Sequence, residues 1–193
     1  MEDKVAIFID GSNLYHALQN NFRRHDLNFT EFVRKLCGSR TLFRTYYYNV
    51  LQEPAKRSET HKDQSEFLDV LQKTPYLEVR LGSTKLAQGV SVEKGIDIML
   101  ATDLLYFAWN NSYTVAVLVS GDSDFAYALQ AVKNMGKHVE VAYFENVVSK
   151  DLLEIADYQH LLDRRFFAGV WAGKRRRKYR RADTRQETTP AQP

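Results

Sequence analysis

The sequence predicts an α/β protein, a three-layer α/β/α sandwich in which helices cover both faces of a central and mainly parallel sheet. The first observation is that short apolar runs, rich in β-branched and aromatic residues, alternate with amphipathic segments along the 193-residue chain. Such alternation is typical of parallel strands that are joined by helices. The second observation is that KVAIFID, residues 4–10, has the continuous apolar character of a strand buried on both faces.

The first half of the chain is predicted to form two strands, three helices and a further strand near an edge. Residues 28–36 are expected to be helical because Asn28 and Glu31 have the spacing of a capping box. Residues 76–83 alternate between apolar and polar side chains, as a strand near the edge of a sheet does. The other expected elements are strands at 4–10 and 41–51 and helices at 13–22 and within 56–73.

The second half is predicted to begin with a long helix at 94–111, because its apolar side chains recur at helical spacing. A later helix, 124–136, is expected to end at Gly136, since glycine suits the left-handed conformation that often follows a last helical turn. The apolar positions of the long helix are Ile96, Met99, Leu100, Leu104 and Phe107. The remaining elements are strands at 113–120 and 137–144, a short helix at 150–156 and an edge strand at 158–162.

The charge of the chain is unevenly distributed. The formal net charge is +3, yet residues 174–193 contain eight basic and two acidic residues. These residues therefore have a charge of +6, which leaves −3 for residues 1–173. We predict one domain over residues 1–173 and a basic, disordered tail over 174–193, and this asymmetry favours a polyanionic partner that the tail helps to hold.

Cysteine usage and hydropathy indicate the compartment. Cys37 is the single cysteine, which excludes an internal disulfide and a cysteine-based zinc site. The start of the chain lacks the basic region of a signal peptide, and no apolar stretch reaches the roughly 20 residues of a membrane span. We therefore expect a cytoplasmic protein with no membrane partner. Its sequence is compatible with both a monomer and a homo-oligomer.

Acidic residues follow two of the predicted strands. Asp10 ends the first strand, and Asp122 and Asp124 come directly after the apolar run at 113–120. Ligands of doubly wound sheets bind outside the carboxyl ends of the strands, where the strand order reverses. If these two strands are neighbours, the three carboxylates meet in one crevice.

Asp97 is predicted to add a fourth carboxylate to this crevice. It lies in the first turn of the helix at 94–111, at the border of the apolar stripe, so it should lean over the sheet. Four carboxylates in one crevice repel one another unless cations neutralise them. Oxygen ligands select hard ions, so we expect Mg²⁺ or Mn²⁺ at Asp10, Asp97, Asp122 and Asp124.

A structural role is the alternative for each acid. An aspartate after a strand is commonly a turn former or a helix cap, which applies to Asp10 and, with even weight, to Asp124. Asp103 lies about 9 Å along the helix axis from Asp97, too far to share one ion easily. We therefore expect Asp103 to be a buried acid bonded to the backbone or a support for the site.

Further residues are candidates for contact with the substrate. Ser12 is expected to cap the helix at 13–22, whereas Asn13 could orient a water or touch a phosphate at the helix start. Ser120 could hydrogen-bond a metal-binding carboxylate or simply end its strand. Lys94 could contact a phosphate, although a solvated lysine is commoner. In the tail, the candidates for binding nucleic acid are Arg175, Arg176 and Arg177.

Three stretches of the chain resemble the signatures of NYN domains, in particular the LabA-like branch of the PIN-like nuclease superfamily. These stretches are FIDGSNLYHAL, KGIDIMLATDLL and VLVSGDSDFAYALQAVKNMGKHVEVAYF, in the same order and spacing. The resemblance covers about residues 4–162 and implies a PIN-like fold. It also implies a metal-dependent ribonuclease with acids at Asp10, Asp97, Asp122 and Asp124 and Asn13 as a helper. Residues 57–89 and the basic tail lie outside these signatures.

Three functions compete on the sequence. The first is a nuclease whose metal ions activate water and stabilise the leaving oxygen of an RNA phosphodiester, with DNA as an alternative substrate. The second is a phosphatase of the haloacid dehalogenase type, which is disfavoured because its second acid would fall at Ser12. The third is a non-catalytic RNA-binding or regulatory scaffold protein with the same fold.

Overall fold

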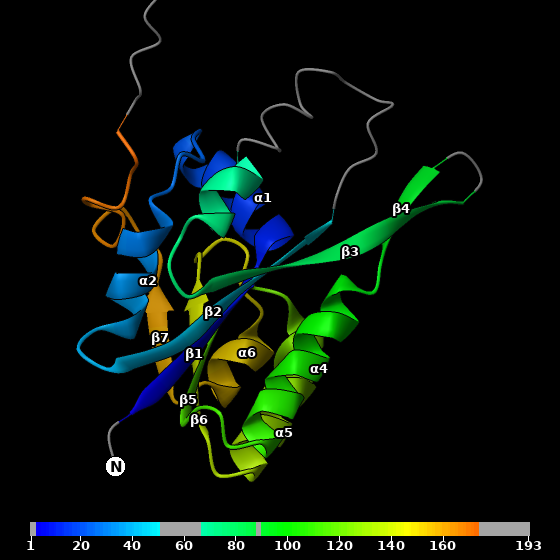
Figure 1. The fold of residues 1–193 in the computed structure, drawn as a ribbon, viewed down its shortest axis with the longest axis vertical. Helices are drawn as coiled ribbons and strands as arrows, with labels where there is room; N and C mark the ends of the chain where they lie inside the picture. Colours follow the sequence, from blue (N-terminus) through cyan, green and yellow to red (C-terminus); the bar gives the residue numbers. More distant parts are fainter. Residues whose placement is uncertain (1–2, 51–66, 88–89, 174–193) are drawn as a thin grey trace, which may run out of the picture.

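The computed structural model describes residues 3–50, 67–87 and 90–173, and these form a seven-stranded sheet covered by helices (Figure 1). The strand order is β4-β3-β2-β1-β5-β6-β7. All pairings are parallel except that of β3 with β4, which is antiparallel. The predicted fold class, an α/β sandwich around a mainly parallel sheet, is therefore confirmed.

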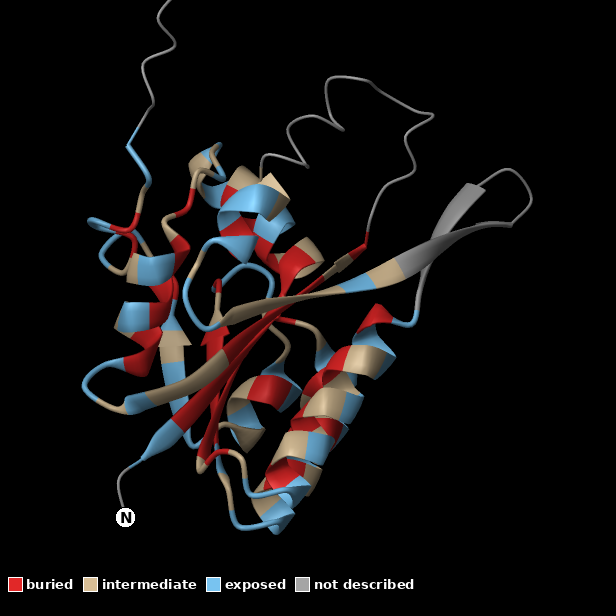
Figure 2. Ribbon diagram, in the orientation of Figure 1, coloured by how far each residue is buried: buried red, intermediate tan, exposed pale blue. Residues whose placement is uncertain are grey.

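The middle of the sheet consists of strands that are buried on both faces. In β1, every residue from Val5 to Asp10 is buried, and all five residues of β5 are buried as well (Figure 2). Burial on both faces requires a continuous apolar run, which is the pattern that both segments have. The strands are β1 (Lys4–Asp10), β2 (Thr41–Val50), β3 (Leu77–Ala87), β4 (Val90–Lys94), β5 (Val115–Val119), β6 (His138–Tyr143) and β7 (Tyr158–Leu161).

Two apolar cores lie on opposite faces of the sheet, and each is covered by its own helices. On one face, Leu14 of α1 and Phe32 of α2 pack with Ile7 and Ile9 of β1. On the other face, Leu104 of α4 and Leu129 of α5 pack with the intervening β1 residues, such as Phe8. The helices are α1 (Gly11–Phe22), α2 (Phe29–Cys37), α4 (Ile96–Trp109), the 3-10 turn η1 (Ser123–Phe125), α5 (Ala126–Asn134) and α6 (Lys150–Ile155).

The predicted elements agree with the structure except in a few places. The cap of α2 is as predicted, because the Asn28 side chain accepts a hydrogen bond from the backbone N–H of Glu31. Gly136, after α5, has the expected positive φ of 77°. The helix predicted within 56–73 is seen at 67–72, and its earlier residues lie outside the described chain. The prediction missed β4, which extends β3 into an antiparallel hairpin and takes the edge of the sheet.

The strand order places the candidate acids at the point where the chain changes direction across the sheet. From β1 the chain builds outward through β2 to β4, whereas β5 returns to the other side of β1 and continues to β7. The carboxyl ends of β1 and β5 are therefore adjacent at a topological switch point, with Ile9 paired to Val119. The two strands that precede the candidate acids are therefore neighbours, which is the condition for their carboxylates to meet in one crevice.

Gly121 follows β5 and is predicted to be intolerant of a side chain. A methyl group on its Cα would overlap the backbone carbonyl of Val147, and backbone atoms cannot swing away as a flexible side chain can. We expect Gly121→Ala to lower the free energy of unfolding by about 1–3 kcal/mol, the usual cost of overpacking. Urea titration of both proteins measures this difference.

Ser123→Ala is the control for this variant, because Ser123 is exposed two residues further on. It should change the stability by less than about 0.5 kcal/mol. If Gly121→Ala were as stable as the wild type, the close approach of the two loops would be wrong.

Candidate functional site

A pocket of about 340 Å³ lies at the switch point between the carboxyl ends of β1 and β5. Its walls come from the start of α1, the first turn of α4 and the loops that follow β5 and β6. Three of the four predicted metal ligands line it: Asp10, Asp97 and Asp122. Asp124 is not among the lining residues. The other lining residues are Ser12, Asn13, His16, Ala17, Asn20, Gly95, Ile96 and Val147.

Asp10 is the buried carboxylate of the pocket, with 8% of its surface exposed. Its Oδ1 accepts a hydrogen bond from the backbone N–H of Asn13 at 3.0 Å, which makes Asp10 the N-cap of α1. Its Oδ2 accepts a hydrogen bond from the hydroxyl of Ser120, also at 3.0 Å. The expectation that Ser12 caps this helix was therefore wrong, because the helix begins earlier, at Gly11, and leaves the capping position to Asp10.

Two further hydrogen bonds join the loop after β5 to the start of α1. The Ser120 Oγ accepts from the backbone N–H of Asp122 at 3.1 Å while its hydroxyl donates to Asp10. The side-chain oxygen of Asn13 accepts from the backbone N–H of Gly121 at 3.2 Å. Ser120 is 2% exposed, so its hydroxyl supports a carboxylate of the site, which is one of the two roles that the sequence left open.

Asp122, rather than Asp124, is the cap in the GDSD segment. The Asp122 Oδ1 accepts a hydrogen bond from the backbone N–H of Asp124 at 3.0 Å and so caps η1. The capping role that the sequence assigned to Asp124 with even weight therefore belongs to its neighbour. The side chain of Asp124 is exposed beside the pocket, and its charge reaches Asp97.

Asp97 lies in the first turn of α4, which begins after Gly95 in a left-handed conformation with φ of 81°. No side chain caps this helix start, and Asp97 is the acidic residue of its first turn, where the helix dipole favours a negative charge. Asp97 is an exposed residue, more so than its position at the border of the apolar stripe suggested. Asp97 nevertheless lines the pocket.

The carboxylates perturb one another. Burial is the main reason why the pKa of Asp10 is raised, the hydrogen bonds from Asn13 and Ser120 oppose this rise, and the charges of Asp97 and Asp122 add to it. Partial loss of water raises the pKa of Asp97 as well, and the charges of Asp122 and Asp124 raise it further. These carboxylates therefore share a field of excess negative charge that a bound cation would relieve.

The donor set of the pocket fits a hard divalent cation. Its lining contains carboxylate, amide and hydroxyl oxygens, and none of the described lining residues is a lysine or arginine. Across the described ranges, no group of three or more His, Cys, Asp or Glu side chains could hold a metal ion as placed. Mg²⁺ commonly uses only one or two carboxylates, together with waters and substrate phosphates, so the pocket fits this mode of binding.

The sequence argument missed the part of the pocket that α1 supplies. His16 and Asn20 line the pocket with Asn13 and Ala17. The signal was present, because positions 13, 16, 17 and 20 recur at the spacing of one helix face. Of the other candidates, the side chain of Lys94 and all of Arg175, Arg176 and Arg177 lie outside the described residues.

Asp103 has a role other than the backbone contact that was expected. The hydroxyl of Tyr48 donates a hydrogen bond to its Oδ2 at 2.9 Å, and Arg80 lies 3.7 Å from the same oxygen. These partners come from β2 and β3. Asp103 therefore fastens α4 to the sheet and is not among the residues that line the pocket.

Fold and site together define the class of the protein, a parallel α/β sandwich with carboxylates at the ends of its two central strands. Residues 4–163 match the NYN domain family, and the chain belongs to that family. It is 29% identical over 178 residues to the low amplitude and bright protein LabA of Synechococcus elongatus, covering 85% of this chain and 87% of that protein. The LabA-like resemblance is thereby confirmed.

A solved structure has the same fold. The crystal structure of VPA0982 from Vibrio parahaemolyticus, titled a protein of unknown function, aligns with a TM-score of 0.67 and 20% identity over 84% of this chain and 94% of that one. NYN domains belong to the PIN-like nuclease superfamily, and NYN nucleases typically use divalent metals. Among the described helices, none has the length and apolar character that a membrane crossing needs.

The raised pKa of Asp10 predicts how stability depends on pH in the metal-free protein. A carboxyl that holds its proton more tightly when folded stabilises the fold below its unfolded pKa, and this stabilisation is lost as the pH rises through the folded pKa. The contribution of Asp10 to the free energy of unfolding should therefore fall as the pH rises above the unfolded value of 3.8. Urea titrations in EDTA at a series of pH values measure this dependence.

Asp10→Asn is the comparison for this measurement. Asparagine keeps a carbonyl oxygen that can cap α1, but it has no charge to bury. Relative to the wild type, the variant should gain stability as the pH rises above 3.8, because it has no buried carboxyl to ionise. An unchanged slope would mean that Asp10 is not a source of the dependence.

Proposed function

We propose that this protein is a divalent-metal-dependent ribonuclease that hydrolyses RNA phosphodiester bonds, with Mg²⁺ or Mn²⁺ as its cofactor. The observation that carries the proposal is the convergence of Asp10, Asp97 and Asp122 on one pocket with no lysine or arginine in its described lining. Membership of a nuclease-like family supports the same reaction. Asp124 is the fourth acid of the proposal, acting from the exposed rim.

The residues of the chain have distinct tasks in this proposal. Asp10 offers a carboxylate whose direction is set by two hydrogen bonds, from the Asn13 backbone and the Ser120 hydroxyl. Asp97 and Asp122 face the same space from two other elements. Bound divalent ions would supply Lewis-acid chemistry, which polarises the phosphodiester and stabilises the charge of the leaving oxygen.

Asn13 is proposed as a helper that holds this frame together. Its backbone N–H binds Asp10, and its side-chain oxygen binds the backbone of Gly121. One residue thus couples the ends of both central strands. Its side-chain nitrogen is proposed to donate to a water or a phosphate oxygen.

One observation favours the alternative, a non-catalytic RNA-binding or regulatory scaffold. Asp10 and Asp122 both cap helices, so these carboxylates have a structural use even without catalysis. Capping alone does not explain Asp97, which lines the same pocket and whose pKa is raised by partial loss of water and by the charges of Asp122 and Asp124. The nuclease therefore remains the better account.

Incubation of the full chain with labelled single-stranded RNA and DNA tests the function. Cleavage of RNA is expected with Mn²⁺ or Mg²⁺ and should stop in EDTA. Cleavage of DNA alone would change the substrate class. Binding of RNA without cleavage under any metal condition would favour the scaffold.

Asp122→Asn is predicted to keep the fold and lose the activity. The cap of η1 needs only an acceptor oxygen, which asparagine retains. The lost charge weakens metal binding, so the cleavage rate should fall by about 100-fold or more. Loss of a group that only supports a metal ligand already costs up to about 100-fold, and Asp122 is proposed to be a ligand itself. Single-turnover RNA cleavage at several Mn²⁺ concentrations measures the change.

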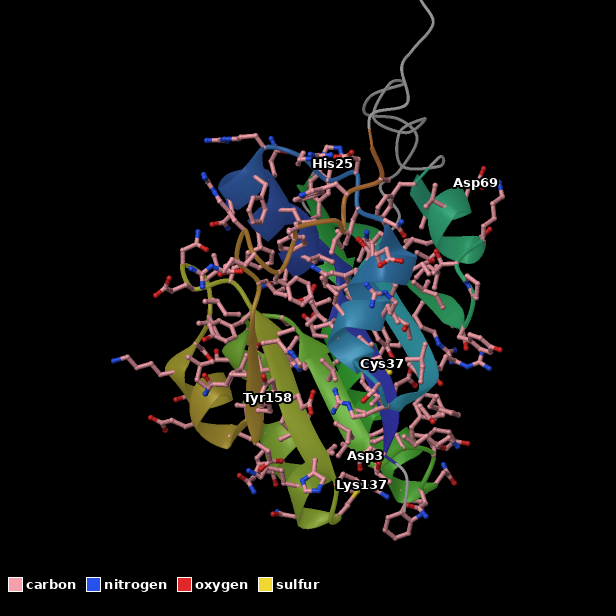
Figure 3. The ribbon with its side chains drawn as sticks, turned by 90° about the vertical axis from the view of Figure 1, so that its left-hand side faces the viewer. Asp3, His25, Cys37, Asp69, Lys137 and Tyr158 are labelled. Atoms are coloured by element: carbon pink, nitrogen blue, oxygen red, sulfur yellow. The ribbon has the colours of Figure 1, made fainter. Side chains whose placement is uncertain are left out.

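The control is Asp69→Asn, which removes an equal charge from an exposed residue outside the pocket (Figure 3). It should cleave at the wild-type rate. Wild-type cleavage by Asp122→Asn, with the same dependence on Mn²⁺, would remove Asp122 from the proposed ligands.

The basic tail is proposed to be an electrostatic arm for the nucleic acid. Residues 1–173 have a charge of −3, and the metal-free pocket is acidic, so a polyanion needs a compensating basic group. Deletion of residues 174–193 should weaken binding at low salt and flatten the salt dependence, since each lost phosphate contact removes a roughly constant slope. Affinity measured over a range of salt concentrations checks this.

Turnover at saturating RNA should survive the deletion, because every proposed metal ligand precedes the tail. Equal affinity and equal salt slope for both proteins would refute the arm. A loss of turnover at saturation would place a catalytic group in the tail instead.

A further inference from the structure

Three exposed rings form a continuous strip beside the acidic pocket. Tyr15 lies between two histidines, with its ring centroid 5.6 Å from that of His16 and 5.1 Å from that of His25. All three residues are exposed, and Tyr15 has 43% of its surface accessible. The rings of Tyr15 and His16 are nearly perpendicular, at 80°, and those of Tyr15 and His25 are tilted by 40°, so the strip presents both ring faces and ring edges to a partner.

One end of this aromatic strip belongs to the pocket. His16 is a lining residue, on the same helix face as Asn13 and Asn20. Tyr15 is the next residue back along α1, so its ring continues outward from the pocket wall. A ligand that extends beyond the acids on this side would therefore meet Tyr15 and then His25.

The other end of the strip has an exposed cation, Arg23, at the C-cap of α1. The guanidinium of Arg24 lies 4.3 Å from the centre of the Trp171 ring, but its charge is paired with Asp26 at 2.6 Å. Figure 3 shows His25 at the same end of the molecule as the last described residues. The backbone N–H of Ala172 donates to the carbonyl of Asp26 at 2.9 Å, which fastens the end of the described chain to this place.

The described chain ends at Gly173, and the next residues in the sequence are basic, starting with Lys174. Along α1 and its C-cap, the acidic pocket is thus followed by the aromatic strip and by the exposed Arg23. Exposed rings next to positive charge are the combination that binds single-stranded nucleic acid, in which bases stack on the rings and phosphates meet the cations.

We propose that Tyr15, His16 and His25 form a stacking platform that holds the bases of a single-stranded RNA while an adjoining phosphodiester lies in the acidic pocket. The choice of RNA rests on the proposed function, whereas the platform itself is a binding surface. Stacking requires unpaired bases, because the bases of a duplex already stack on one another. The platform therefore selects single strands and is indifferent to base identity.

Binding of a fluorescent oligouridylate to the full chain in EDTA tests the platform without any cleavage. Tyr15→Leu should weaken the affinity by about tenfold, within the range reported for loss of one base-stacking ring, whereas Tyr15→Phe keeps the ring and should bind within about twofold of the wild type. His25→Leu is a second variant at an exposed position outside the helix, and it should weaken binding in the same direction.

Two matched ligands separate stacking from any other effect. An oligonucleotide of the same length without bases should bind Tyr15→Leu and the wild type equally, because no base is present to stack. Duplex RNA should likewise show no dependence on Tyr15. Trp109→Leu is the control variant, because Trp109 is 80% exposed at the far end of α4, about 18 Å along the axis from Asp97, and should not affect binding.

The platform is overturned if Tyr15→Leu and His25→Leu bind oligouridylate as tightly as the wild type, or if their losses persist with the ligand that has no bases. Absence of binding by the wild type also overturns it. Failure of the platform is distinct from failure of the proposed function. A chain that cleaves RNA with Mn²⁺ but shows no Tyr15 effect retains the nuclease, whereas Tyr15-dependent binding without cleavage retains only the platform.

Discussion

The buried carboxylate of Asp10 is the group on which the arrangement of the site depends. A carboxylate with 8% exposure needs hydrogen-bond donors, since an unsatisfied buried charge is costly. The donors come from two places, the first turn of α1 and the hydroxyl of Ser120 at the end of β5. The pairing of β1 with β5 brings their ends together, and the hydrogen bonds of Asp10 then join the start of α1 to the end of β5 at the pocket.

The same hydrogen bonds explain why the carboxylates of the site stay close together although they repel one another. Ser120 and Asn13 each bond both strand ends, so the backbone around Asp10 and Asp122 is held from two sides. The acids still face one another without a lysine or arginine in the described lining, and the pKa values of Asp10 and Asp97 are raised. Because these hydrogen bonds keep the carboxylates from moving apart, a bound cation is needed to offset their repulsion. The phosphates of a polyanion could then serve as further ligands of that cation.

Helix α1 connects this pocket to the rest of the surface. Its first turn is capped by Asp10, its buried face includes Leu14, Ala17 and Leu18, and its other faces present His16 to the pocket and Tyr15 to solvent. Because successive residues of a helix point in different directions, neighbouring positions of α1 contact the core, the pocket and the solvent. The helix ends at Phe22 and is followed by the exposed C-cap Arg23, so a single element leads from the acidic pocket to the far end of the proposed RNA path.

The sequence alone determined the elements with strong local signals and the residues that follow them. Continuous apolar runs marked β1 and β5 as central strands, the Asn28 cap marked the start of α2, and the acids after both strands marked the edge where the pocket lies. Only the tertiary structure decided that Ser120 donates to Asp10, that Asp124 stays outside the pocket, and that Asp103 binds Tyr48. It also decided that β4 takes the edge of the sheet and that His16 joins the site. The physical reason is that periodicity and capping act within a few residues of the chain, whereas pairing of an edge strand and sharing of a hydrogen bond by Asp10 and Ser120 join residues far apart in sequence.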